Sequence, residues 1–252
     1  MNAMYVEAPV NDHRKEAMNT ATPFIKVEHL TKIFYPPRAR SLLSRKSPKN
    51  GFKAVNDVSF EVKRGEIFVI MGLSGSGKST IIRMLNRLID TTEGSIVIDG
   101  KDVGALDPAK LRAFRNETIN MVFQHFGLFP HLSLLDNVAF GLKIRGVDRQ
   151  TREAKATEAL SLVGLGDRTH AMPDQLSGGM RQRVGLARAL ATDAEILLMD
   201  EPFSALDPLI RQDMQQLLIE LQRNFKKTIV FVTHDLDEAM YLGDQIMVMK
   251  EG

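Results

Sequence analysis

The chain has 252 residues, of which 44% are hydrophobic and 25% are charged, an ordinary globular composition that allows a sizeable core. Its formal net charge of only +2 argues against binding nucleic acid or acidic lipid through the overall field of the molecule. The sequence contains no cysteine, which excludes disulfides, thiolate catalysis and zinc–thiolate sites and is consistent with a reducing compartment. No apolar run approaches the roughly 18 to 20 residues of a membrane-spanning helix, so we expect a cytoplasmic chain that does not cross a membrane.

The chain begins with charged and polar residues that have no apolar core, so we expect 1–22 to be a disordered tail and not a secretory signal. The β-rich runs that follow include several that are apolar throughout, which predicts strands buried on both faces. The predicted strands are 25–34, 54–62, 67–71, 95–98, 119–123, 195–200, 228–233 and 245–250. The predicted helices are 78–88, 134–145, 151–163, 178–191 and 209–225. Because strands and helices alternate, we predict an α/β fold with a mostly parallel core sheet, in one domain over 23–252.

Two stretches interrupt this alternation. The basic stretch 36–53 begins with two prolines and favours a solvated loop, with a contact to anionic lipid or to a partner as the alternative. Between about 124 and 190 the sequence predicts several helices and no strand. We therefore expect a helical subdomain inserted between two strands of the sheet.

A glycine-rich segment follows the apolar run Ile67–Ile70 and precedes a helical run. It matches the pattern G-x-x-x-x-G-K-[S/T], in which glycines let backbone N–H groups turn inward and form an anion nest at a helix start. Lys78 is expected to reach the β- and γ-phosphates of a nucleotide, and the Ser79 hydroxyl to ligate Mg²⁺. A glycine-rich turn with a solvated lysine is the alternative, which the flanking strand and helix disfavour. The predicted phosphate-binding residues are Gly72, Leu73, Ser74, Gly75, Ser76, Gly77, Lys78, Ser79 and Thr80.

Two carboxylates stand at the end of the apolar run Ile196–Met199. Open α/β sheets place their ligands at the carboxyl ends of strands, so Asp200 and Glu201 are candidates for a site. Since neighbouring strand residues alternate sides, Asp200 is expected to meet the metal and Glu201 the attacking water. Such a pair alone is commonly only a polar strand end, but together with the glycine-rich segment it predicts a site.

The sequence Leu176-Ser-Gly-Gly-Met-Arg-Gln182 opens a predicted helix and supplies a second potential anion site. In its position between the glycine-rich segment and Asp200, it resembles the signature of ATP-binding cassette (ABC) ATPases. The resemblance implies a P-loop NTPase fold with a mostly parallel core sheet, an antiparallel β subdomain and an inserted helical subdomain. It also implies a head-to-tail homodimer that sandwiches two ATP molecules. Each ATP would lie between the loop of one copy and Ser177, Gly178 and Gly179 of the other.

Other residues take roles only through this resemblance. Gln124 resembles the glutamine that joins Mg²⁺ and links the nucleotide site to the helical insertion, and Asp207 resembles a residue of the loop that crosses the dimer interface. His234 resembles the switch histidine that touches the γ-phosphate. Phe34 resembles the aromatic residue that stacks on adenine, with Tyr35 as its rival, although either could belong to the core. The implied catalytic residues are Glu201, His234 and Gln124, and the implied metal ligands are Ser79, Gln124 and Asp200.

Four motifs, GLSGSGKST, LSGGMRQRVGLARALA, FSALDPLIR and HDLDEAM, are similar to those of the glycine betaine/proline branch of quaternary amine importers. The similarity covers about 25–252. Pro202 stands where some members of the branch have alanine, and the paired CBS domains of many members are not expected in this sequence.

The resemblance implies an ATPase that uses ATP and Mg²⁺ to drive uptake of glycine betaine, proline, choline, carnitine or trimethylamine N-oxide. Its expected partners are transmembrane permease subunits and a periplasmic or extracellular solute-binding protein, with no nucleic acid. Its expected place is peripheral, on the cytoplasmic face of the inner (plasma) membrane. The apolar stretch 126–137 is either core or a groove for a permease helix.

Other functions remain open at this point. One alternative is an importer ATPase for another small solute, and another is a non-transport soluble ABC ATPase. A GTPase would need an Asn-Lys-x-Asp segment, which does not occur. A chromosome ATPase would need a long coiled coil, and a ribosome-associated protein would usually carry two cassettes, so a single cassette favours transport.

Overall fold

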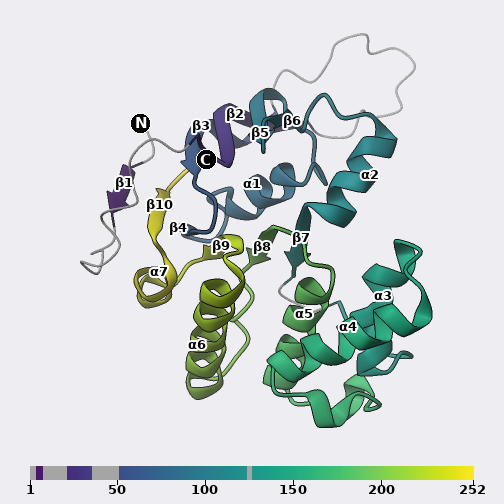
Figure 1. The fold of residues 1–252 in the computed structure, drawn as a ribbon. Helices are drawn as coiled ribbons and strands as arrows, with labels where there is room; N and C mark the ends of the chain where they lie inside the picture. The colour runs from purple at the N-terminus through teal and green to yellow at the C-terminus, as the bar shows by residue number, and fades with distance from the viewer. Residues whose placement is uncertain (1–3, 8–21, 36–50, 124–126) are drawn as a thin grey trace, which may run out of the picture.

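The computed structural model describes residues 4–7, 22–35, 51–123 and 127–252. Within these ranges a six-stranded sheet has the order β1-β10-β4-β9-β8-β7 (Figure 1). Its strands are β1 Met4–Glu7, β10 Gln245–Met249, β4 Ile67–Gly72, β9 Thr228–Thr233, β8 Ile196–Asp200 and β7 Ile119–Val122. All neighbours except β1 and β10 pair in parallel, which confirms the predicted α/β class with a mostly parallel sheet.

The central strands are buried because their sequences are mostly apolar. β8 and β9 are buried at every residue, as expected for parallel strands covered on both faces. Their register pairs Leu197 with Ile229, and β9 in turn pairs Ile229 with Ile67 of β4. The three strands therefore end close together at their carboxyl ends.

A second, antiparallel sheet has the order β3-β2-β5-β6. Its strands are β2 Ile25–Phe34, β3 Phe52–Val62, β5 Glu93–Ile98 and β6 Lys101–Asp102. Helix α1, Lys78–Leu85, lies between the two sheets and shares one apolar core with both (Figure 1). Phe60 of β3 stacks on Phe68 of β4 with ring centroids 5.0 Å apart, which joins the sheets directly. The predicted antiparallel β subdomain is confirmed.

Three helices occupy the chain between β7 and β8, where the helical insertion was predicted. They pack on one another and gather to one side of the parallel sheet in Figure 1. Their apolar residues belong to one core with β8, β9 and the later helices. These helices are α3 Leu134–Ile144, α4 Arg149–Leu162 and α5 Gly178–Ala191, with 3₁₀ turns at Gly166–Arg168 and Pro173–Gln175.

The remaining helices are α2 Pro108–Glu117, α6 Pro208–Phe225 and α7 Leu236–Leu242. Helices α2 and α7 were not predicted. Phe114 is the only buried residue of α2, so its apolar periodicity is too weak to detect, and α7 is only seven residues long. None of the described helices is long and apolar enough to cross a bilayer.

Most predicted elements are confirmed with bounds that differ by one or two residues, and the larger differences have local causes. Helix α1 ends at Leu85 and not at residue 88, because Arg87 has a left-handed backbone with φ 52°. The expected disordered tail contains β1, which pairs with the otherwise open edge of β10. In the basic stretch, β3 already begins at Phe52, and 36–50 lies outside the described residues.

Candidate functional site

The predicted phosphate loop, the two carboxylates and His234 follow three neighbouring strands that end at the same edge of the sheet. β4 leads into the glycine-rich loop, β8 ends at Asp200 with Glu201 directly after it, and β9 ends one residue before His234. The structure therefore brings together groups that lie far apart in the sequence. This is the edge at which open α/β sheets bind ligands.

The N-terminus of α1 differs from those of the other helices. Its N-cap residue, Gly77, provides no side-chain hydrogen bond. Each of the other α-helices in the described part of the chain has a side-chain cap, from Asp107, Ser133, Asp148, Ser177, Asp207 or Asp235. The first N–H groups of a helix need an acceptor, and a phosphate supplies one where no side chain does.

Close backbone approach explains two glycines of the loop. A Cβ atom on Gly77 would lie 2.2 Å from the carbonyl oxygen of Ala54, and one on Gly72 would lie 2.2 Å from that of Met249. Gly77 also has φ 98°, a conformation that side chains disfavour. The hydroxyl of Ser76 is buried without a hydrogen-bond partner in the described structure, so the loop also holds an unused polar group.

Lys78 is 4% exposed and lies inside the loop. Its Nζ donates to the carbonyl oxygens of Gly72, at 2.7 Å, and Leu73, at 2.9 Å. Burial lowers the pKa of Lys78, while the carboxylates of Glu201 and Asp200 act in the opposite direction. A phosphate would give this ammonium a charged acceptor in place of neutral carbonyls, which makes a stronger hydrogen bond.

Ser79 and Asp200 are in direct contact. The Ser79 hydroxyl donates to Asp200 Oδ1 at 2.7 Å, and Arg83 Nη2 lies 3.4 Å from Asp200 Oδ2. Hydroxyl and carboxylate oxygens are suitable ligands for Mg²⁺, which usually completes its shell with water and substrate phosphate. The described residues contain no group of three His, Cys, Asp or Glu side chains that could hold a metal alone. Ser79 and Asp200 are two of the three expected metal ligands, and the third, Gln124, lies outside the described residues.

Glu201 turns away from Asp200, as predicted, but the cause is a bend and not strand alternation alone. Its backbone is left-handed with φ 47°, and its N–H still donates to Val232 O at 3.0 Å. The carboxylate consequently faces the loop: Oε2 lies 3.0 Å from His234 Nδ1, and Oε1 lies 3.9 Å from Lys78 Nζ. A non-glycine residue with positive φ is uncommon, and such strain often occurs at functional sites.

The signature residues lie on the N-termini of α5 and α6 and have local roles there. Ser177 Oγ accepts from Met180 N at 3.3 Å, and Asp207 Oδ1 accepts from Ile210 N at 3.1 Å. A Cβ atom on Gly179 would lie 2.4 Å from Ile210 Cγ2, so glycine is needed where the two helices meet. Among the described contacts, no hydrogen bond or ion pair joins Ser177, Gly178 or Gly179 to the glycine-rich loop. Within the described part of one copy, these contacts do not join the two predicted anion sites.

Phe34 and Tyr35 are exposed, 41% and 57%, so the alternative that they belong to the core is wrong. Phe34 pairs across the sheet with Phe52, a second exposed aromatic residue that the sequence did not indicate. Phe52 lies two residues from Ala54, which contacts the loop at Gly77. Lys32 Nζ lies 5.2 Å from the centroid of the Phe34 ring. The register thus places exposed aromatic rings beside the phosphate loop.

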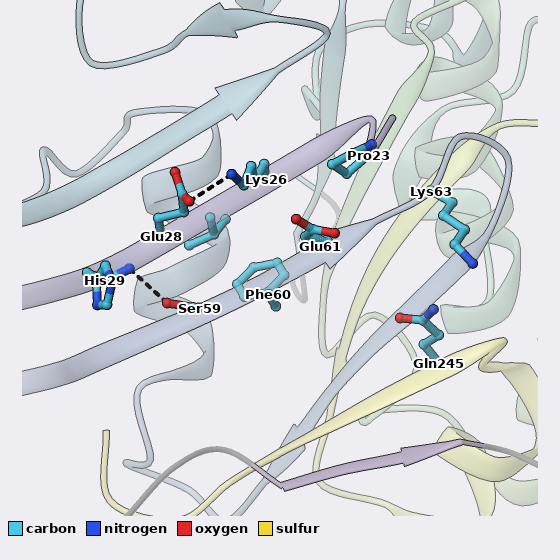
Figure 2. A pocket seen from close by; sticks show the side chains of 10 residues that line it. Pro23, Lys26, Glu28, His29, Ser59, Phe60, Glu61, Lys63 and Gln245 are labelled. Carbon is cyan, nitrogen blue, oxygen red and sulfur yellow. Dashed lines mark hydrogen bonds and ion pairs between the residues drawn. The ribbon is translucent and has the colours of Figure 1, made fainter. Parts of the chain in front are cut away.

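Two cavities in the described part of the chain are lined by other residues than the predicted site residues. One, of about 610 Å³, lies against β2, β3 and Gln245 and contains none of the predicted site residues (Figure 2). The other, of about 340 Å³, is lined by Phe123, Phe129, Phe140 and Arg188 among others. Within the described part of the apolar stretch 126–137, Leu134 belongs to the core whereas Phe129 lines the second cavity, so the stretch is not core throughout.

Comparison with known proteins agrees with this geometry. A family model described as "ABC transporter" matches residues 55–204. The glycine betaine transport ATP-binding protein OpuAA of Bacillus subtilis is 56% identical over 237 residues, which cover 90% of this chain and 57% of that protein. The glycine betaine/carnitine transport ATP-binding protein GbuA of Listeria monocytogenes is 55% identical over 237 residues, covering 90% of this chain and 60% of that protein.

The chain is also similar to solved structures of an ABC transporter cassette. The dimeric structure of MJ0796, a bacterial ABC transporter cassette, has a TM-score of 0.76 at 36% identity and covers 90% of this chain and 94% of that chain. A dimeric post-hydrolysis state of that ATP-binding cassette, bound to ADP and Pi, has a TM-score of 0.75 at 36% identity with the same coverage.

The fold and the loop define a nucleotide-binding α/β protein of the P-loop class. The chain belongs to the ABC transporter family. Its similarity to glycine betaine transport ATP-binding proteins confirms the resemblance that the four motifs indicated. The chain spans less than two thirds of the length of OpuAA and of GbuA.

The buried ammonium of Lys78 generates the first prediction. We expect Lys78→Ala to lower the affinity for ATP roughly 10- to 100-fold, because a hydrogen bond to a charged group contributes about 1.5–3 kcal/mol. Nucleotide titration by calorimetry measures this change. Lys101→Ala, at an exposed lysine of β6, is the matched control and should bind like the parent. Unchanged affinity in Lys78→Ala would contradict the assignment of the loop.

Proposed function

We propose that the chain is the ATP-hydrolysing subunit of an ABC importer that takes up a quaternary amine or a related osmolyte. The observation that carries ATP hydrolysis is the meeting of Lys78, Asp200, Glu201 and His234 at one edge of the parallel sheet. The choice of solute is supported by similarity to proteins whose names state glycine betaine or carnitine transport. Such similarity is an associational argument, so the solute needs its own test.

The loop and α1 bind the triphosphate. The uncapped N–H groups at the start of α1 donate to the phosphate oxygens, and the Lys78 ammonium reaches the β- and γ-phosphates. Ser79 and Asp200, which already touch, would hold Mg²⁺, with Gln124 as a further expected ligand. The ion, when bound, neutralises charge on the phosphates. The rings of Phe34 or Tyr35 offer a surface on which adenine stacks.

Glu201 is placed to act on the attacking water. In the reaction, the water oxygen bonds to the γ-phosphorus, the bond from that phosphorus to the bridging oxygen of ADP breaks, and a proton of the water passes to the Glu201 carboxylate. His234 hydrogen-bonds to Glu201 Oε2 and so orients that carboxylate. Lys78 and the helix terminus stabilise the charge that develops on phosphate in the transition state.

The second anion site requires a second copy. Ser177 is exposed at the start of α5, and Asp207 is exposed at the start of α6. Because one copy does not bring these residues to its own loop, we propose that a head-to-tail homodimer does so across two ATP molecules. ATP binding would close the pair and hydrolysis would reopen it, which couples the reaction to mechanical work.

The groove lined by Phe123, Phe129 and Phe140 is the proposed docking place for a transmembrane permease subunit. Its apolar lining suits an amphipathic helix, the helix-in-groove mode of recognition. The permease would hold the chain at the cytoplasmic face of the membrane as a peripheral subunit. A periplasmic or extracellular solute-binding protein would deliver the solute to the permease.

Glu201 generates the second prediction. We expect Glu201→Gln to retain ATP binding while hydrolysis falls by roughly 10²- to 10⁴-fold, the usual contribution of a positioned base. A phosphate-release assay together with nucleotide titration separates the two effects. Glu158→Gln, at an exposed site on α4, controls for the loss of a carboxylate. Turnover near the parent rate would exclude Glu201 as the base.

The shared site generates the third prediction. In a Glu201→Gln background, we expect Ser177→Arg to abolish ATP-dependent dimerisation, because a large cation replaces the small hydroxyl that caps α5. Gel filtration with and without ATP measures the dimer. Ser161→Arg, at an exposed serine of α4, is the control and should still dimerise. An undiminished dimer with Ser177→Arg would count against a site shared between copies.

The solute generates the fourth prediction. We expect the partner solute-binding protein to bind at least one of betaine, choline, carnitine, proline and trimethylamine N-oxide, measured by calorimetry. Methionine serves as a small solute outside this class. Binding of methionine alone would favour an importer for another solute. Co-purification of the chain with ribosomes and not with a membrane protein would favour a non-transport ATPase.

A further inference from the structure

Arg211, on the first turn of α6, connects the two segments that flank the catalytic edge. Its Nη1 lies 3.2 Å from Asp235 Oδ2, and its Nη2 donates to Leu206 O at 3.2 Å. Leu206 belongs to the segment that follows Glu201, and Asp235 directly follows His234. One guanidinium therefore spans the loop after β8 and the loop after β9.

The backbone of Arg211 is fixed in the first turn of α6. Helix α6 begins at Pro208 with Asp207 as its N-cap, and Arg211 N donates to Asp207 O at 2.9 Å. The planar guanidinium presents several donors in a fixed fork, so it can hold two acceptors at once. A lysine ammonium at this position would keep the charge without that fork.

Asp235 is held from both sides. Its Oδ1 accepts from Asp237 N at 2.9 Å and from Glu238 N at 3.2 Å, which caps α7, while Oδ2 faces Arg211. Its own N–H donates to Thr233 Oγ1 at 3.0 Å. His234 lies between Thr233 and Asp235 along the chain, so these bonds restrict the backbone that carries the imidazole.

A second contact between α6 and the start of α7 lies one turn further along α6. Gln215 Nε2 donates to Glu238 Oε1 at 3.2 Å, and both side chains are buried. Burial raises the pKa of Glu238, as expected for a carboxyl shielded from water. Helix α6 thus contacts the start of α7 at two successive turns.

Stability alone does not account for the Arg211 contacts. The Arg211 and Asp235 side chains are 29% and 34% exposed, and ion pairs with this much solvent access contribute little to folding. Arg211 Nε is buried without a partner in the described structure, which is a cost. The two contacts of the Arg211 guanidinium instead fix the separation between the loop after β8 and the loop after β9.

We propose that Arg211 is a positioning residue for ATP hydrolysis. By bridging Leu206 O and Asp235, it holds the His234 side chain where it can hydrogen-bond to the Glu201 carboxylate. This role rests on the proposed ATPase function. Arg211 touches neither the nucleotide loop nor Glu201 among the described contacts, so it acts through His234 and through the segment that follows Glu201.

Kinetics of three variants test the proposal. Arg211→Met removes the donors and keeps an apolar stem, so we expect kcat to fall about 10- to 100-fold, the effect of a small misplacement of a catalytic group. KM for ATP should change by less than about 3-fold, and Tm by less than about 3 °C. Arg211→Lys should have an intermediate kcat. Arg223→Met, at an exposed arginine of the same helix, should match the parent.

A double variant sharpens this test. Because Arg211 is proposed to act through Asp235, adding Asp235→Asn to Arg211→Met should cause little further loss of kcat. Independent, multiplicative losses would overturn the proposal. A kcat of Arg211→Met within about twofold of the parent value would also overturn it. The same holds if the loss of kcat is accompanied by a comparable rise in KM and a large fall in Tm.

Amide hydrogen exchange separates this proposal from the proposed function, since it requires no ATP turnover. Arg211→Met should increase exchange several-fold in both 204–207 and 234–238, without a matching increase in β8 or β9. Unchanged exchange in either segment, or the same increase in Arg223→Met, would overturn the bridge. If the parent protein hydrolyses no ATP, the proposed function is wrong. The hydrogen-exchange measurement still shows in that case whether Arg211 holds the two loops together.

Discussion

The N–H groups at the start of α1 are the constraint on which the site depends. Backbone donors require acceptors, and every other described α-helix obtains one from its own Asp or Ser side chain. At α1 the cap residue is Gly77, which offers no side chain and lies against Ala54 O too closely to accept one. Capping by an anion is therefore built into the backbone, and Lys78 adds positive charge at the same place.

The parallel sheet brings further charged groups to this helix terminus. Because β4, β8 and β9 are neighbours and run in the same direction, the residues that follow them meet at one edge. Asp200 contacts Ser79, whereas the bend in the backbone at Glu201 points the Glu201 carboxylate toward Lys78 and His234. Two adjacent carboxylates thereby face different partners, and this difference comes from backbone conformation and not from side-chain chemistry.

The sequence predicts those parts of the structure that depend on local pattern. Apolar runs identify the buried strands, and the glycine spacing identifies the phosphate loop with Lys78. It does not predict α2, which buries only Phe114, nor the positive φ of Glu201, which depends on a hydrogen bond to β9. The contact of Arg211 with Asp235 joins residues 24 positions apart and has no local pattern. The metal-binding and catalytic roles expected of Gln124, which lies outside the described residues, stay predictions.

The fit between Gly179 and Ile210 has a mechanical consequence. With a hypothetical methyl group only 2.4 Å from Ile210 Cγ2, the tips of α5 and α6 have no free space between them, and packed interiors respond to force as solids. A displacement of the tip of α5 is therefore expected to carry with it the tip of α6, whose first turn holds Arg211.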